Sequence, residues 1–299
     1  MKIVRVSGGL GNQLFQYAFA RALELRTGDE VFLDLSTYGY EAAHNGFELD
    51  GLFAVRYKAA AEKDIVRLGT RPQGSFSQLR RKYFTKRTHH IDRLFRYDSE
   101  VFSLKGDRYF EGWWQTERYF APYADKLKEE LRFIANPGAH NEALLRDIAG
   151  ATGVDLVSVH VRRGDALKNP DTWVCTDAYY RRALETIRAR EGRKLHFLVF
   201  SDDLAWCKEH LALAPNEATF VDWNRGAESW RDMWLMSRCP SHIIANSTFS
   251  WWGAWLDPSP SKIVLAPERW SLAKPRPFAY YRYTFDEVVP ENWIRIPVE

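Results

Sequence analysis

The sequence predicts an α/β protein of two domains, the second of them built on a doubly wound parallel sheet. Strand and helix patterns alternate regularly after about residue 154, which is typical of a parallel sheet covered by helices. A βαβ pattern also occupies the first forty residues. For a chain of 299 residues, two domains are the better expectation.

The N-terminal βαβ pattern begins with a strand that runs into a glycine turn. We place strands at Lys2–Ser7 and Val31–Leu35, the turn at Gly8–Gly11 and a helix at Asn12–Arg26. A domain boundary is expected near 136–154, because Asn136-Pro137-Gly138 interrupts the chain after a charged helix predicted over Tyr119–Phe133. The predicted domains are therefore 1–140 and 150–299.

The second domain shows five strand patterns separated by helical ones. The strands are predicted at Leu156–Val161, His196–Ser201, Thr219–Asp222, His242–Asn246 and Lys262–Ala266. The helices are predicted at Asp177–Arg190, Leu204–Leu213, Glu228–Arg238 and Phe249–Leu256. This half is therefore expected to be Rossmann-like.

Composition excludes several classes of protein. A net charge of +3 gives no reason to expect a nucleic-acid partner. The three cysteines, Cys175, Cys207 and Cys239, lie far apart and argue against a disulfide scaffold or a zinc cage.

Without a leader or a membrane-length apolar stretch, we expect a cytoplasmic protein, with peripheral binding at the inner face of the membrane as an alternative. The basic stretch 71–96 is either a solvated face or a surface for anionic lipid-linked acceptors.

Polar residues follow four of the five predicted strands of the second domain. They are His160, Arg162, Arg163 and Asp165 after the first, Ser201, Asp202 and Asp203 after the second, Asp222 after the third, and Asn246, Ser247 and Thr248 after the fourth. In open α/β sheets, ligands bind beyond the carboxyl ends of the strands. The pattern thus predicts one polar rim suited to a nucleoside diphosphate.

Each group on this rim has a plausible part in nucleotide binding. Arginine forks hold phosphate oxygens, a helix N-terminus at Ser247 and Thr248 receives an anion, and the Asp222 carboxylate suits guanine. Taken alone, Asp202 or Ser247 could be a helix cap and the two arginines could be ion-pair partners. A dinucleotide site at Gly9-Leu10-Gly11 is disfavoured, because Leu14 occupies the third glycine position.

Several segments together resemble the α-1,2-fucosyltransferases of glycosyltransferase family 11. The segments are Ser7–Tyr17, Phe110–Gln115, His160–Asp165, Asn246–Ala254 and, more weakly, Asn45–Leu49. The resemblance runs through nearly the whole chain, and the tail after about residue 270 is its least characteristic part. The chain departs from the family pattern at Ala166, where an aromatic residue is common.

The resemblance implies a GT-B architecture, in which two Rossmann-like domains face each other across a cleft. It implies transfer of fucose from GDP-fucose to a galactose-terminated oligosaccharide or lipid-linked glycan, with inversion and without a metal or other cofactor. GDP-fucose would bind the C-terminal domain, and the acceptor mainly the N-terminal one. The resemblance carries no expectation about oligomeric state.

Residue roles follow from the same resemblance. Arg162 contacts the β-phosphate, His160 and Asp222 lie near the nucleoside, and Asn12 faces the reaction centre. The predicted catalytic residues are Arg162, Asn12 and Asp165, although Asp165 could instead bind the acceptor or brace Arg163. The predicted donor-binding residues are His160, Arg162, Arg163, Asp202, Asp222, Asn246, Ser247, Thr248 and Phe249, and the acceptor-side loop contains Gly9, Gly11 and Gln13.

The general base and several aromatic residues stay open on sequence grounds. Candidates for the base are Asp34, Glu48, Glu111 and Asp165, and a loose transition state could need no strong base. Trp113 and Trp114 either stack on an acceptor sugar or fill a core, whereas Trp251 and Trp252 are expected in the core. Alternative functions are a fucosyltransferase of α-1,6 or protein O-linkage, and a non-catalytic carbohydrate-binding protein.

Overall fold

The chain forms two compact units, and a segment near its C-terminal end returns to the first unit. A computed structural model describes residues 1–39, 45–70, 85–149, 153–164, 166–190, 194–273 and 284–299. The first unit comprises Met1–Ile134 with Lys274–Val288, and the second comprises Ala135–Ala273 with Val289–Glu299. Placing all of 150–299 in one domain is therefore wrong for the described residues 284–288, which return to the first unit.

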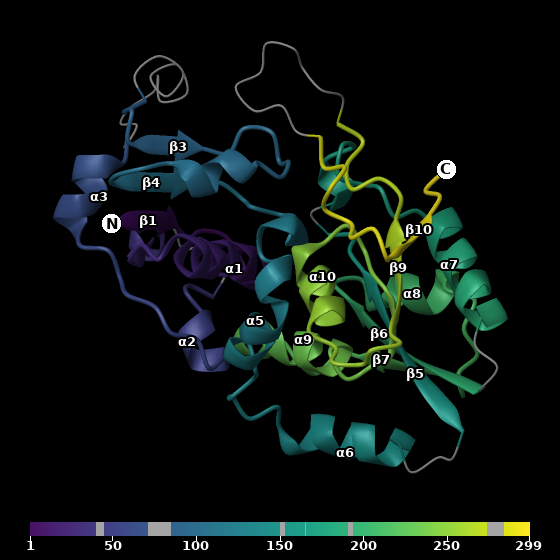
Figure 1. Ribbon diagram of the computed structural model, residues 1–299. Coiled ribbons are helices and arrows are strands. Elements are labelled where there is room, and N and C mark those ends of the chain that lie inside the picture. The colour runs from purple at the N-terminus through teal and green to yellow at the C-terminus, as the bar shows by residue number, and fades with distance from the viewer. Residues whose placement is uncertain (40–44, 71–84, 150–152, 165, 191–193, 274–283) are drawn as a thin grey trace. The chain divides into compact units, whose positions relative to one another are not determined.

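The first unit is built on a four-stranded sheet in which every pairing is parallel. Its strands are β1 (Lys2–Arg5), β2 (Val31–Asp34), β3 (His89–Ile91) and β4 (Arg108–Glu111), in the order β2-β1-β4-β3. Helix α1 (Leu10–Thr27) crosses from β1 to β2, as the βαβ pattern predicted (Figure 1). Among the described residues, it is accompanied by the short helices α2 (Leu49–Leu52), α3 (Glu62–Leu68) and α5 (Ala124–Glu130).

Aromatic side chains form much of the core of the first unit. The rings of Phe19, on α1, and Trp114, just after β4, stack with centroids 3.8 Å apart. Phe110 and Tyr119 meet the ring of Phe19 edge-on. Trp114 is 1% exposed, so of the two readings offered for this residue the structure supports the core.

The second unit contains a six-stranded parallel sheet. Its strands are β5 (Val154–Val161), β6 (Lys194–Ser201), β7 (Ala218–Val221), β8 (Ser241–Ile243), β9 (Ile263–Pro267) and β10 (Ile294–Ile296), in the order β10-β9-β8-β5-β6-β7. Val161 pairs with Ser201, and Phe200 pairs with Val221. The carboxyl ends of β5, β6 and β7 are therefore neighbours.

Helices cover both faces of this sheet, as the doubly wound prediction required. Helices α7 (Asp177–Arg190) and α8 (Leu204–His210) lie on one face, where Tyr179, Leu184 and Cys207 pack against alternate residues of β5 and β6 (Figure 1). Helices α9 (Trp230–Met236) and α10 (Thr248–Trp255) lie on the other. Helix α6 (Ala139–Ala149) precedes β5 in this unit.

Short 3-10 helices connect the larger elements. They are η1 (Ser36–Gly39), η2 (Ser99–Ser103), η3 (Glu117–Tyr119), η4 (Ala121–Tyr123), η5 (Ala166–Lys168) and η6 (Gly226–Glu228). The predicted helix Tyr119–Phe133 is wrong at its start, because Pro122 lies in η4 and the α-helix begins only at Ala124. Proline lacks a backbone N–H and fits only the first turn of a helix.

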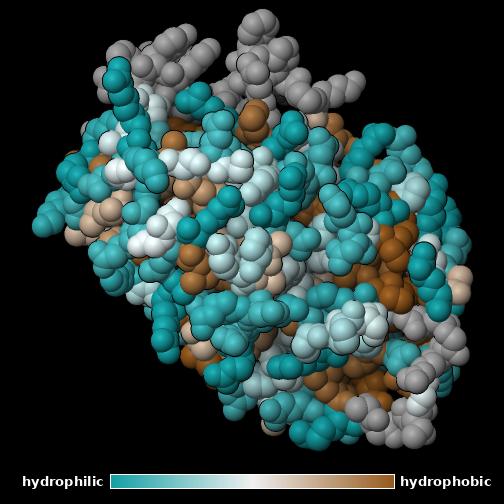
Figure 2. All heavy atoms as spheres, viewed as in Figure 1, coloured by the Kyte–Doolittle hydropathy of each residue, from teal (hydrophilic) through white to brown (hydrophobic). Residues whose placement is uncertain are grey.

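The apolar faces of the helices point into the two cores, and hydrophilic residues cover most of the surface seen in Figure 2. Within the described ranges, none of the helices combines the length and the apolar character needed to cross a bilayer. The cytoplasmic location stays a prediction.

Candidate functional site

The loop after β5 is held in place by the carboxylate of Asp202. The backbone N–H groups of Arg163 and Gly164 donate to its Oδ1 and Oδ2 atoms, at 2.9 and 2.8 Å. A β-carbon on Gly164 would lie 2.7 Å from Oδ2, so the loop can approach Asp202 this closely only with glycine there. Asp202 was expected to bind the nucleotide, and its carboxylate instead braces the loop that carries the arginines.

Arg162 is half-buried and fixed from the neighbouring strand end. Its Nη1 atom donates to the backbone oxygen of Asn246 at 3.2 Å. The side-chain amide of Asn246 donates in turn to the backbone oxygens of Thr172 and Trp270, at 2.9 and 3.1 Å. The side-chain amide of Asn246 is therefore buried and already hydrogen-bonded. Asn246 contributes to the site through its backbone carbonyl, which holds the guanidinium of Arg162 beside the start of α10.

The second arginine of the loop is engaged by α8. The Nε atom of Arg163 donates to Asp203 Oδ2 at 3.1 Å, and its guanidinium lies 4.1 Å from the ring centre of Trp206. Asp203 also caps α8 by accepting from the backbone N–H of Trp206. Arg163 is therefore a structural partner of α8, the alternative that the sequence had left open.

The N-terminus of α10 faces the same strand ends. Ser247 caps this helix, with its hydroxyl accepting from the backbone N–H of Phe249 at 3.3 Å. Thr248 begins the helix, so its N–H group belongs to the set that finds no partner inside a helix and favours anions. The cap prediction for Ser247 is confirmed, and it is compatible with an anion site.

His160 is a neutral imidazole at the end of β5. Burial, and then the positive charge of Arg162, lower the pKa of His160 to about 3. The Nδ1 atom is buried and makes no hydrogen bond within the part of the chain that the structure describes. The ring lies 6.1 Å from that of Phe249. A buried nitrogen without a partner is costly unless a ligand or water satisfies it, which is compatible with the predicted place of His160 near a bound nucleoside.

Polar groups deep in the second unit support α10 from behind. Lys262 Nζ donates to the backbone oxygens of Ala254, Trp255 and Asp257, at 2.8, 2.9 and 2.9 Å, and so closes the end of the helix.

A hydrogen-bonded row of three side chains lies in the same unit. It consists of Ser158, His242 and Asp257, with separations of 2.8 and 3.3 Å. All three are at most 2% exposed, so this row supports the fold and is closed to substrates.

Trp251 and Trp252, on the same helix, are fully buried. Their predicted core position is therefore confirmed.

Two glutamines of α1 join the loops of the first unit that carry the quoted sequence motifs. Gln13 is fully buried, accepts from the N–H of Glu48 at 2.9 Å and donates to the carbonyls of Gly8 and Gly46. Gln16 accepts from the N–H of Ser7 and donates to the carbonyl of Gly112. Gln13 was expected in the acceptor-side loop, and its amide joins that loop to the loop at Gly46 and Glu48.

The side-chain amide of Asn12 lies beside Gly8 in the glycine turn. Gln115 donates from Nε2 to Asn12 Oδ1 at 3.0 Å. The Asn12 Nδ2 atom lies 2.8 Å from the place of a β-carbon on Gly8, whose φ of +79° also favours glycine. Gly9 precedes α1 and accepts from the N–H groups of Asn12 and Gln13, while Gly11 is buried in the helix. The sequence had not singled out Gln16 or Gln115, although both lie inside the quoted motifs.

The structure limits the choice of general base. Asp34 is 2% exposed, and its two oxygens accept from the Tyr109 hydroxyl and the Ser36 N–H, so it cannot reach an acceptor. Glu111 forms an ion pair with Arg5 at 3.1 Å. Glu48 accepts from the side chain of Asn45 at 3.2 Å. Asp165 lies outside the described residues, as do residues 71–84 of the basic stretch.

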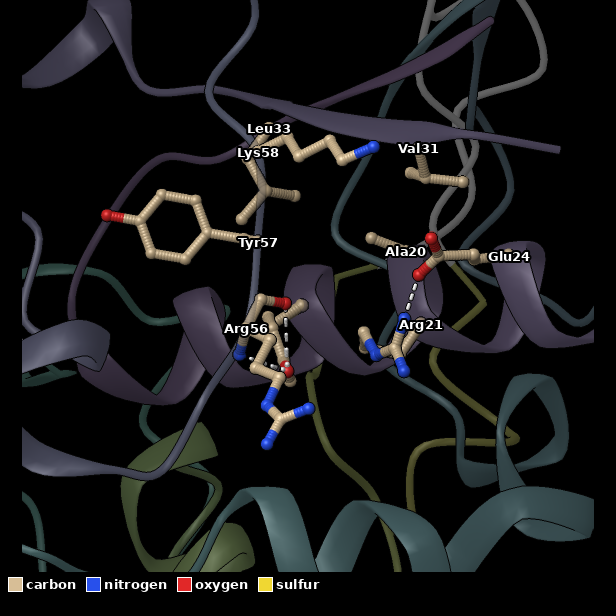
Figure 3. A pocket seen from close by; sticks show the side chains of 9 residues that line it. Ala20, Arg21, Glu24, Val31, Leu33, Arg56, Tyr57 and Lys58 are labelled. Carbon is tan, nitrogen blue, oxygen red and sulfur yellow. Dashed lines mark hydrogen bonds and ion pairs between the residues drawn. The ribbon is translucent and has the colours of Figure 1, made fainter.

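A separate cavity of about 300 Å³ opens on the first unit between α1 and β2 (Figure 3). Three cations line it, Arg21, Arg56 and Lys58. Arg21 pairs with Glu24 and Glu130, and Lys58 pairs with Glu30. The cavity contains none of the predicted site residues. Within the described ranges, no group of three or more His, Cys, Asp or Glu side chains is arranged to hold a metal ion.

Comparison with known proteins identifies the family. The profile of glycosyl transferase family 11 matches residues 77–293. An "Alpha-1,2-colitosyltransferase" of Escherichia coli is 34% identical over 98% of both chains. This chain belongs to glycosyltransferase family 11. Human "Galactoside alpha-(1,2)-fucosyltransferase 1" is 38% identical over a shorter stretch, 33% of this chain and 28% of that protein.

Solved structures show that this family 11 glycosyltransferase shares the GT-B fold. NodZ α-1,6-fucosyltransferase, soaked with GDP-fucose, has a TM-score of 0.52 at 17% identity, covering 86% of this chain and 92% of that one. POFUT1 in complex with GDP-fucose has a TM-score of 0.50 at 12% identity, covering 89% and 97%. The predicted α/β class with parallel sheets is confirmed, and the cleft between the domains stays a prediction.

Proposed function

We propose that this family 11 enzyme transfers L-fucose from GDP-fucose to the 2-hydroxyl of a terminal galactose in a glycan, with inversion and without a metal. The observation that carries the proposal is the fixed position of Arg162, between a braced loop and the N-terminus of α10. The neutral His160 beside it leaves a buried nitrogen for the donor.

The chemistry follows from where charge develops. As the bond between the anomeric carbon and the β-phosphate oxygen breaks, its electron pair stays with GDP and negative charge grows on that oxygen. A guanidinium and a helix N-terminus already in place stabilise this charge more in the transition state than in the ground state. The galactose hydroxyl attacks the opposite face of the sugar, forms the new bond to the anomeric carbon, and gives its proton to a carboxylate or, where no strong base is needed, to water. In this proposal, Asn12 binds on the acceptor side.

The α-1,2 linkage is proposed from the relatives. Two of them are named as α-1,2-transferases, of colitose and of fucose, and one matches nearly the full length of the chain. The α-1,6 and protein O-fucosylation alternatives rest on structural likeness at 17% identity or less. A non-catalytic binding protein would have no need for a fixed arginine at the leaving group.

A colitosyl donor is the second candidate, because the relative that matches 98% of the chain carries that name. Colitose is fucose without its 3-hydroxyl. A site that hydrogen-bonds this hydroxyl rejects the analogue lacking it, by as much as ~10⁴-fold. The ratio of kcat/KM for GDP-fucose and GDP-colitose therefore distinguishes the two donors.

The deciding experiment is incubation with each GDP-sugar and a panel of galactosides, followed by linkage determination. We expect a product substituted at the galactose 2-hydroxyl, formed equally well in EDTA. A different linkage would overturn the acceptor assignment, and loss of activity in EDTA would overturn the metal-free mechanism. Absence of GDP binding in calorimetry would overturn the enzyme's proposed donor altogether.

A further inference from the structure

The loop that follows β7 is held by a hydrogen-bond network whose members have no role in the proposed reaction. It begins with Asp222, directly after the strand, and continues through Trp223 and Asn224 toward α9. Its partner is Asn141, on helix α6, which is only 1% exposed. The loop and α6 both belong to the second unit, although they are more than 80 residues apart in sequence.

Every polar atom of the two asparagine side chains is paired. Asn141 Oδ1 accepts from Trp223 Nε1 at 2.7 Å and from Asn224 Nδ2 at 3.2 Å. Asn141 Nδ2 donates to the carbonyl of Pro137 at 2.6 Å and to Asn224 Oδ1 at 3.1 Å. Asn224 Nδ2 also donates to Asp232 Oδ1 at 2.9 Å. Because an indole N–H can only donate and a carbonyl can only accept, both amides are fixed in orientation.

Ring stacking closes the clamp from outside. The ring of His140 lies on that of Trp223, with centroids 4.3 Å apart and planes 24° from parallel. On the other side of Asp222, Arg225 Nε donates to its backbone oxygen at 2.7 Å. The backbone of Asp222 is thus bounded by a strand, the clamp and Arg225. Its side chain is exposed, and its carboxylate has no partner within the described ranges.

The location suits recognition of a nucleobase. One strand, β6, separates β7 from β5. Neighbouring strands lie about 4.8 Å apart, so the end of β7 is roughly 10 Å from the arginine loop. That is close to the reach of a nucleoside diphosphate. A carboxylate accepts two hydrogen bonds from the N1–H and amino group of guanine, whereas adenine offers it no such pair.

We propose that Asn141 and Asn224 are positioning residues that hold Asp222 for guanine, so that α6 sets the base selectivity of the donor site. The inference rests on the proposed function, in which the donor carries GDP. The diphosphate contacts lie on other loops, after β5 and before α10, so the clamp affects the base without affecting the phosphates.

The test compares GDP and ADP binding by calorimetry in the full chain. Asn141→Leu removes all four hydrogen bonds of the Asn141 side chain, and Trp223→Phe removes one while keeping a ring against His140. Glu142→Gln is the matched control, an exposed change on the same helix. Thermal unfolding establishes that each variant is folded.

We expect Asn141→Leu to weaken GDP binding about tenfold and to leave ADP binding unchanged, so that the preference for guanine falls by the same factor. Trp223→Phe should shift the preference in the same direction, and it decides the matter if Asn141→Leu does not fold. Unchanged GDP binding in a folded variant, or equal weakening of GDP and ADP, would overturn the role of the clamp. If the wild-type protein bound no GDP, the proposed function would fail first.

Discussion

At the scale of single residues, Arg162 has the most direct expected effect on catalysis. Arg162→Ala removes the guanidinium that we propose contacts the leaving group, and we expect a loss of at least ~2 kcal/mol of transition-state stabilisation in kcat/KM. Arg162→Lys keeps the charge but loses the planar fork, and should recover part of that loss. Steady-state kinetics with GDP-fucose measure both, and near-normal turnover by the alanine variant would refute the assignment.

A second residue-scale prediction concerns Asp232, the last member of the asparagine network. Burial raises the pKa of Asp232 from 3.8 to about 7, against a hydrogen bond from Asn224 that lowers it. The folded state therefore holds this proton more tightly than the unfolded state does. The resulting stability is fully present below pH 3.8 and is lost as the pH rises through about 7.

Asp232→Asn keeps the oxygen that accepts from Asn224 and removes the titration. In urea unfolding across this pH range, we expect the variant to lack the decline due to Asp232 and to gain stability over the wild type above neutral pH. Asp147→Asn, an exposed change in the same unit, serves as control. Parallel pH profiles of the Asp232 variant and the wild type would contradict the assignment.

Sequence indicated which residues gather at the site better than it indicated what each one does. The polar residues after β5, β6 and β8 do meet, because parallel strands bring their carboxyl ends to one edge. The brace at Asp202, by contrast, depends on two backbone N–H groups that only the folded loop directs toward it. The sequence likewise did not show that Gln13 is used within the fold, because its backbone partners come from a loop 33 to 35 residues away.

At the scale of elements, helix α10 should depend on Lys262. Lys262→Met keeps most of the aliphatic stem but leaves three backbone oxygens at the helix end without their donor. Loss of a charged donor to such groups should lower the free energy of unfolding by about 2 kcal/mol. Chemical denaturation checks this, with the exposed Lys194→Met as control. Equal stability of the two variants would show that water replaces the ammonium at no cost.

The regular elements were predictable where the periodic pattern was long. Helix α7 has the predicted bounds, and all five predicted strands of the second half are present within a few residues. Strands β3, β4 and β10 were missed. Strands β1, β2, β7 and β8 are equally short, but they were found because they stand in a regular alternation of strand and helix patterns, which the segments around the missed strands lack. Strand β4 lies between β1 and β3, so its place depends on pairing that the local sequence does not encode.

At the scale of the whole molecule, the return of residues 284–288 makes the first unit depend on the end of the chain. The rings of Phe95 and Phe285 lie 4.9 Å apart, and both residues have positive φ angles, 53° and 52°. Glu287 accepts from the N–H of Tyr97 at 2.6 Å and pairs with Arg118 at 2.8 Å. This strained segment persists because contacts on both sides fix it.

Phe285→Ala should therefore destabilise the first unit, although residue 285 comes after most of the second unit in the sequence. We expect a loss of about 2 kcal/mol for a half-buried ring, seen as faster hydrogen exchange in β4 with exchange in β5 unchanged. Asp286→Asn, an exposed neighbour, is the control. Faster exchange in β5 alone would assign the segment to the second unit.

The pair of buried glutamines in α1 has a consequence for attempts to change the acceptor. Gln13 joins the glycine turn to the loop at Gly46, and Gln16 joins it to the loop at Gly112. A loop transplanted singly from a relative would arrive with carbonyls placed for another scaffold and would leave one amide unmatched inside the protein. If these loops bind the acceptor as proposed, all three and α1 would have to be transplanted together to exchange it.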